Sequence, residues 1–232
     1  MKRIERIRMD HHYIHMYLND KDFRAKVSLY IGFTLDCIYV LFKCGSGIIY
    51  RSTWLGAIGI YYFMIGLIRF MLLRSDRRIR AYDDDKRLYL EYISYRKCGI
   101  LMFILDMVIS IIAMHMVYQN KSYSYSGYTI YLTALYTFYY FITAIISVVS
   151  YGKRNRPILS AAKQLSLAAG WMSMYALQTA MLATFSEDAI NFRRTMNTIT
   201  GGCVCIYIII TAVRMIVHST RMIRKLEQTE KV

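Results

Sequence analysis

Proline is almost absent from this chain of 232 residues, because Pro157 is the only one. Transporter helices broken by proline are therefore excluded, whereas a glycine break stays open at Gly201-Gly202. The sequence also lacks a P-loop, a dinucleotide-binding glycine pattern and an H-E-x-x-H motif. The Gly-Ser-Gly run at 45–47 lacks the G-x-S-x-G spacing of a nucleophile elbow. The sequence therefore assigns no catalytic residue.

Acidic residues are few: 15 Asp and Glu stand against 30 Lys and Arg, which gives a net charge of +15. In a soluble protein this balance would indicate nucleic acid. Here the basic residues lie in short segments between long apolar runs, where they set the orientation of membrane helices. We therefore expect contact with anionic lipid at the cytoplasmic face and no nucleic-acid partner.

Metal-binding patterns are also weak. The five cysteines are odd in number and lack zinc-finger spacing. Cys203 and Cys205 are two residues apart, so on a helix their side chains point about 200° apart and cannot close on one ion. His11 and His15 would share a helix face, but His12 stands where a zinc protease needs Glu. We expect no metal and no cofactor.

Long apolar runs dominate the chain, of which 56% is hydrophobic. About 20 helical residues cross the roughly 30 Å hydrocarbon core of a bilayer. The sequence therefore predicts an all-α, polytopic transmembrane bundle of about six helices. The predicted spans are 26–46, 52–73, 98–118, 128–151, 159–183 and 199–218.

The predicted domain organisation follows from these spans. Residues 1–25 form a polar N-terminal segment, so the first span is expected to insert as an uncleaved anchor. Residues 26–218 form the transmembrane domain, with a cytoplasmic loop at 74–97, and residues 219–232 form a tail.

Basic residues alternate between the two sides of these spans. The N-terminal segment together with Lys26 at the edge of the first span holds seven Lys and Arg, the 74–97 loop eight, the 152–158 loop three and the tail four, whereas the other three loops hold four together. The positive-inside rule then places both termini in the cytoplasm. We expect a multi-pass protein of the plasma or inner membrane.

Internal similarities point to three repeated helical hairpins. Residues 33–36 resemble 103–106, and residues 61–69 align without gaps to 139–147 and 206–214. Shared lipid-facing composition is the alternative explanation. The fifth span differs, because two stripes of small residues along it predict close packing at the centre of the bundle. The stripes are Ala162, Ser166, Gly170 and Ser173, and Ala169, Ser173, Ala176 and Ala180.

Charged residues inside the spans are the candidate polar site, because a charge in hydrocarbon is costly. Asp36 and Asp106 fall near the midplane, roughly 13–15 Å from the inner edge at 1.5 Å per residue. Arg69 and Arg214 fall in the inner third, where they either snorkel to the headgroups or face a shared cavity and bind an anion or a lipid phosphate. An ion pair between Asp36 and Arg69 and a transport role for the aspartates are both left open.

Three diffuse stretches carry a resemblance to a known group: residues 50–54 (Tyr-Arg-Ser-Thr-Trp), 159–163 (Leu-Ser-Ala-Ala-Lys) and 177–181 (Leu-Gln-Thr-Ala-Met). In these the chain resembles a group of uncharacterised six-helix bacterial integral membrane proteins. The resemblance implies the topology and no activity.

Three functions fit the pattern. The leading hypothesis is a transporter or channel subunit for a small solute or ion, supported by the midplane aspartates and the cations below them. The second is a regulatory or partner-binding membrane subunit, with a membrane protein or a second copy of the chain as partner. The third is a membrane-embedded enzyme acting on lipid.

Overall fold

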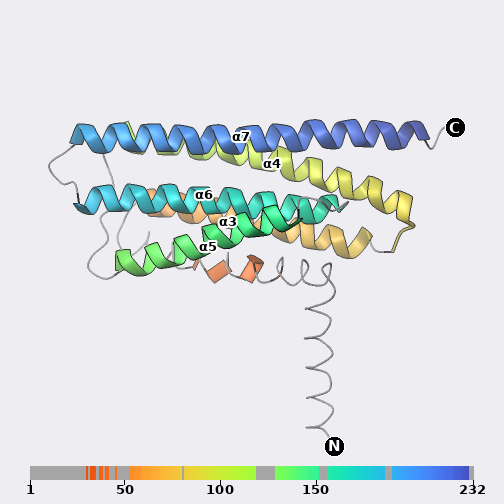
Figure 1. Cartoon of the computed structure of the whole chain (residues 1–232), viewed down its shortest axis with the longest axis horizontal. Helices are drawn as coiled ribbons and strands as arrows, with labels where there is room; N and C mark the ends of the chain where they lie inside the picture. The colour runs from red at the N-terminus through yellow and green to blue at the C-terminus, as the bar shows by residue number, and fades with distance from the viewer. Residues whose placement is uncertain are drawn as a thin grey trace, which may run out of the picture.

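The computed structural model shows a bundle of helices (Figure 1). It describes residues 30, 32–34, 37–38, 40–41, 45, 53–79, 81–118, 129–151, 156–185 and 190–229, and no strand occurs among them. The helices with defined bounds are α3 (Thr53–Ile79), α4 (Asp84–Tyr118), α5 (Thr129–Tyr151), α6 (Pro157–Phe185) and α7 (Ile190–Thr229). The predicted all-α bundle is confirmed. Much of the predicted first span, including Asp36, lies outside the described residues.

The bundle has two distinct ends. We call one the basic end: α3 and α7 finish there, and α4 and α6 begin there (right in Figure 1). At the opposite end α4 and α6 finish, and α5 and α7 begin (left in Figure 1). The basic loops predicted at 74–97 and 152–158 both belong to the basic end, as does the C-terminal end of α7.

Helix starts at the basic end follow from local chemistry. Asp84 and Asp85 lie in the first turn of α4, where acidic side chains complement the helix dipole. The amide of Arg87 donates to the carbonyl of Asp83 at 2.8 Å. α6 begins at Pro157, a residue favoured at the first helical position because its missing N–H is not needed there. Segment 74–97 is therefore mostly helix, with a short turn between α3 and α4.

α6 is the central helix, as its small residues predict. It contacts α3, α4, α5 and α7. The Tyr62 hydroxyl of α3 donates to the carbonyl of Ala169 at 2.8 Å, and the hydroxyls of Thr137 on α5 and Ser173 on α6 lie 3.2 Å apart. Small side chains let the neighbouring backbones approach this closely.

α4 and α7 form a long antiparallel pair, the most extensive helix contact in the bundle (Figure 1). A Cβ atom at Gly99 would lie 3.0 Å from Cβ of Met215, so glycine permits the close approach of the two helices. α7 has 40 residues, which corresponds to about 60 Å of helix, twice the hydrocarbon thickness. The pair extends past α6 at the basic end, where the Tyr89 hydroxyl donates to Glu227 at 3.2 Å.

Consecutive helices do not all pair in space. α4 and α5 make no contact within the described ranges, and α5 packs on α6 instead. Three consecutive packed hairpins are therefore not observed. The lipid-facing composition that the similar segments share is sufficient to explain their similarity.

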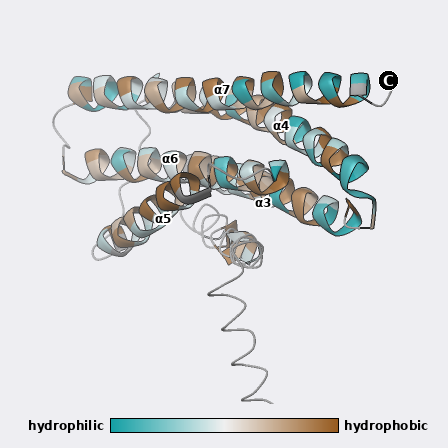
Figure 2. Cartoon of the chain, turned by 45° about the vertical axis from the view of Figure 1, so that its right-hand side comes forward, coloured by the Kyte–Doolittle hydropathy of each residue, from teal (hydrophilic) through white to brown (hydrophobic). Residues whose placement is uncertain are grey.

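Three described helices are long and apolar enough to cross a membrane: Gly56–Ile79, Asp84–His115 and Ile190–Gln228. α5 carries a shorter apolar stretch, Thr133–Val149. Most residues of α6 are buried by the other helices, so α6 offers little surface to lipid. Figure 2 shows hydrophobic residues along α5 and hydrophilic residues at the basic ends of α3, α4 and α7. The three helices indicate a membrane protein.

Candidate functional site

Asp106 lies inside the bundle, in the predicted membrane-spanning part of α4. It is 1% exposed, and neither of its carboxylate oxygens has a hydrogen-bond partner among the described residues. One turn along α4, the Ser110 hydroxyl lies 2.6 Å from the Asp106 backbone carbonyl oxygen and 2.9 Å from Sγ of Cys205 on α7. An ionised carboxylate in such surroundings is among the costliest groups to bury. The site therefore requires a proton or a cation on the carboxylate.

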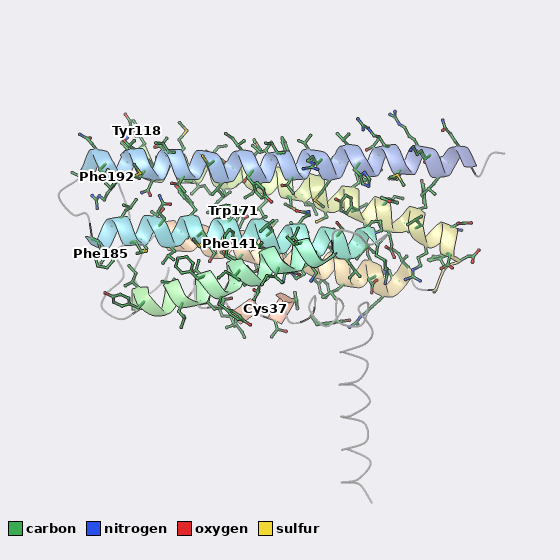
Figure 3. All side chains as sticks on the ribbon, viewed as in Figure 1. Cys37, Tyr118, Phe141, Trp171, Phe185 and Phe192 are labelled. Atoms are coloured by element: carbon green, nitrogen blue, oxygen red, sulfur yellow. The ribbon has the colours of Figure 1, made fainter. Side chains whose placement is uncertain are left out.

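A cavity of about 390 Å³ between α4, α6 and α7 leads toward this carboxylate from the opposite end. Ser110 and Cys205 are the lining residues of α4 and α7 farthest from that end, and Tyr118 and Arg194 line it near that end. The Arg194 guanidinium lies 4.8 Å from the centre of the Tyr118 ring, and Figure 3 shows Tyr118 at this end. Asp106 lies one turn beyond Ser110, about 6 Å along the helix axis. The cavity could therefore serve as an access path from the opposite end of the bundle, and it ends one helical turn before the Asp106 carboxylate.

Arg69 on α3 is also buried, at 1% exposure. Its Nη2 donates to the Ser166 hydroxyl of α6 at 3.2 Å. A Cβ atom added at Gly32 would overlap its Nη1, so the guanidinium lies against the predicted first span. Gly32 precedes Asp36 by one helical turn in the sequence, but Asp36 lies outside the described residues. The predicted pair of Asp36 with Arg69 stays a prediction.

Arg214 on α7 is placed differently. It is exposed and lines a second cavity between α5, α6 and α7, to which Arg69 does not contribute. The shared cavity for Arg69 and Arg214 is not observed. Asp106 forms no ion pair with either arginine. The structure thus buries Arg69 and Asp106 separately and leaves Arg214 on the wall of the second cavity.

An ionic cluster at the basic end escaped the sequence reasoning. Nη2 of Arg156, just before α6, lies 3.0 Å from Oδ1 of Asp76 on α3 and 2.8 Å from Oε1 of Glu91 on α4. Nε of Arg87 lies 3.4 Å from the same Glu91 oxygen. The side chains of Asp76 and Glu91 are only 5% and 3% exposed. This cluster joins three helices at one point.

A signal for the cluster exists in the sequence, although it is faint. Asp76 stands among Arg74, Arg77 and Arg78, and Glu91 lies in the amphipathic stretch that leads into the third predicted span. Because acidic residues are few in this strongly basic segment, each of them is expected to pair with a nearby Lys or Arg. The spacing alone does not show that Arg156, more than 60 residues away, is the partner.

The described part of the chain contains no group of three or more His, Cys, Asp or Glu side chains that could hold a metal ion. The expected absence of a metal and of a cofactor therefore stays a prediction, since His11 and His15 lie outside this part. Compared with known proteins, the chain matches no protein-family model and shows no significant match to a curated protein sequence.

Proposed function

We propose that this chain is a multi-pass membrane protein with its basic end in the cytoplasm, and that it is a proton-coupled transporter or channel subunit that binds the proton at Asp106. The observation that carries the proposal is the buried Asp106 carboxylate, which has no hydrogen-bond partner among the described residues and lies one helical turn beyond the end of a cavity. A packed structural acid would have a cation or a donor beside it. An acid that binds and releases a proton needs an access path instead.

A proton fits this site better than a metal cation. Hard cations such as Mg²⁺ and Ca²⁺ take about six or more oxygen ligands. Among the described residues, the Ser110 hydroxyl and the Cys205 thiol lie one turn away, and neither bonds to the Asp106 carboxylate. The carboxylate can carry a proton there without further ligands.

The charge pattern supports the orientation. Lys and Arg concentrate in the segments that meet at the basic end, and cytoplasmic loops of membrane proteins carry such an excess. In the proposed orientation both termini are cytoplasmic, and the cavity that leads toward Asp106 opens on the far side of the plasma or inner membrane.

Replacing the acid tests the proposed function. We expect Asp106→Asn to remove proton uptake into liposomes that contain the full-length protein, because the amide keeps the shape of the carboxyl group but cannot bind and release a proton. A trapped pH-sensitive dye reports uptake, which a potassium diffusion potential drives. Asp85→Asn, at an exposed acid in the first turn of the same helix, should leave uptake unchanged.

Infrared spectroscopy provides a second readout that does not need flux. The wild-type protein should show the carbonyl band of a buried protonated carboxyl group, and Asp106→Asn should lose it. If wild type and Asp106→Asn, both folded, take up protons equally and have the same infrared band, Asp106 is not the proton site.

A second candidate, a partner-binding subunit, rests on the α4–α7 pair. Its projecting part carries Arg221, Arg224 and Lys225 on an exposed helix end. If this alternative is correct, Asp106→Asn should leave the cellular role of the protein intact. Deletion of residues 221–229 should abolish that role.

A further inference from the structure

A groove runs along α6 between α5 and α7, in the half of the bundle nearer the basic end. α5 and α7 both pack on α6 but not on each other, so α6 forms the floor. The cavity measures about 540 Å³, which is the size of many small-molecule sites. Toward the centre of the bundle the groove ends at Tyr207 on α7, whose ring centre lies 5.4 Å from that of Trp171 on α6. The centre of the Trp171 ring lies in turn 4.7 Å from that of Phe141 on α5 (Figure 3).

The α7 wall of this groove carries a row of basic side chains. Arg214, His218 and Arg221 follow one another at intervals of four and three residues, which places them on one helix face. No carboxylate lines the groove, and Arg214 and Arg221 form no ion pair within the described ranges. Two guanidinium groups therefore remain available to a ligand with negative charge.

The rim beside these cations is apolar. Ile210, Val213 and Val217 on α7 are 52%, 43% and 41% exposed. They lie in a helix that is apolar enough to cross a membrane, where exposed apolar side chains face lipid. On the facing wall, Val148 of α5 also lines the groove. A ligand in this groove would meet positive charge at one end and hydrocarbon along its side, so it must be an amphiphile.

The depth of the groove matches the headgroup region. The predicted span ends at residue 218, so Arg214 lies about 6 Å inside the boundary and Arg221 about 4–5 Å outside it, at 1.5 Å per residue. Phosphate groups of phospholipids lie at this boundary. Arginine binds phosphate well, because its planar guanidinium presents two parallel N–H groups.

We propose that the groove between α5 and α7 binds one anionic phospholipid of the cytoplasmic leaflet. Arg214 and Arg221 hold its phosphate, and its acyl chains lie along Ile210, Val213 and Val148. This site is separate from Asp106 on α4, so lipid binding does not depend on the proposed proton site. Only the choice of the cytoplasmic leaflet rests on the proposed orientation.

Native mass spectrometry of the full-length protein in detergent tests the proposal, with phosphatidylglycerol and phosphatidylcholine as probes. Wild type should retain phosphatidylglycerol preferentially. The double variant Arg214→Gln, Arg221→Gln should bind it about 30-fold more weakly, because two basic contacts to an anionic headgroup are removed. The matched control is Arg224→Gln, Lys225→Gln, which removes the same charge from α7 outside the groove and should bind as wild type does.

A second variant keeps the test decisive if the arginine variant is unstable. Val148→Trp fills the groove and leaves both arginines in place, so it should also lose phosphatidylglycerol. Equal binding of the two lipids by wild type, or unchanged binding in both groove variants, would overturn the proposal. It would also be overturned if inorganic phosphate raised the thermal stability as much as the lipid did and with the same dependence on the arginines, because the site would then bind a free anion.

Discussion

Arg156→Met should lower the free energy of unfolding by up to about 3–5 kcal/mol, because it removes the cation that bridges two buried carboxylates. Arg156 bridges Asp76 and Glu91, whose side chains are 5% and 3% exposed. Arg87 reaches only Glu91, at 3.4 Å, and its side chain is 30% exposed, so it cannot replace the bridge. The substitution therefore weakens the contact between α3, α4 and the start of α6.

Unfolding in mixed detergent micelles, followed by circular dichroism, measures this loss. Arg74→Met is the matched control, because Arg74 is an exposed arginine on α3 two residues before Asp76, and it should change stability by less than about 0.5 kcal/mol. Adding Asp76→Leu and Glu91→Leu to Arg156→Met should recover much of the loss, since the two carboxylates that Arg156 bridges are then no longer buried. Equal stability of Arg156→Met and Arg74→Met would show that the cluster does not hold the three helices together.

Gly170→Leu should destabilise the bundle by about 1–3 kcal/mol or more through overpacking. A Cβ atom at Gly170 would already lie 3.0 Å from the Phe141 ring and 3.6 Å from its Cα atom on α5. The remaining leucine atoms have no room unless α5 moves away from α6. Such a movement would also break the contact between Thr137 and Ser173.

Gly202→Leu provides the comparison for this variant, because no atom lies within 4 Å of a Cβ atom built at Gly202 on α7. Both substitutions add the same side chain within a helix, so the difference isolates the contact with α5. Thermal unfolding in detergent should give a clearly lower midpoint for Gly170→Leu than for Gly202→Leu. Equal midpoints would mean that α6 does not pack closely on α5.

The sequence predicts those features that depend on length, depth and residue size. Long apolar runs predict the helices, and the small-residue stripes correctly predict that α6 is central. The depth of Asp106 predicts its burial, because so short a side chain cannot reach the headgroups. The burial of Asp36 is untested, since that residue lies outside the described part.

Features that depend on helix neighbours are not predictable in this way. α5 packs on α6 rather than on α4, which precedes it, and the apolar pattern of a helix does not say which neighbour it packs against. Arg69 and Arg214 occupy matching positions in the similar segments, yet one is buried against Ser166 and the other lines a groove. Their different surroundings come from different neighbouring helices, which a single sequence does not reveal.

The ionic cluster shows a further limit. Charged residues in a basic segment between apolar runs are normally solvated, and this is how the sequence places Asp76, Glu91 and Arg156. Their burial results from α3 and α4 continuing as helices past the apolar core, so that the side chains face each other. Helix continuation through a charged segment is decided by tertiary packing more than by the local pattern.

Membrane topology is the central claim, and cysteine labelling in intact cells tests it most directly. In a background without the five native cysteines, single cysteines are placed at Ser122, between α4 and α5, and at Tyr82, in the exposed turn between α3 and α4. A membrane-impermeant maleimide should label the cysteine at residue 122 in intact cells and the one at residue 82 only after permeabilisation. Labelling of residue 82 but not residue 122 in intact cells would contradict a cytoplasmic basic end.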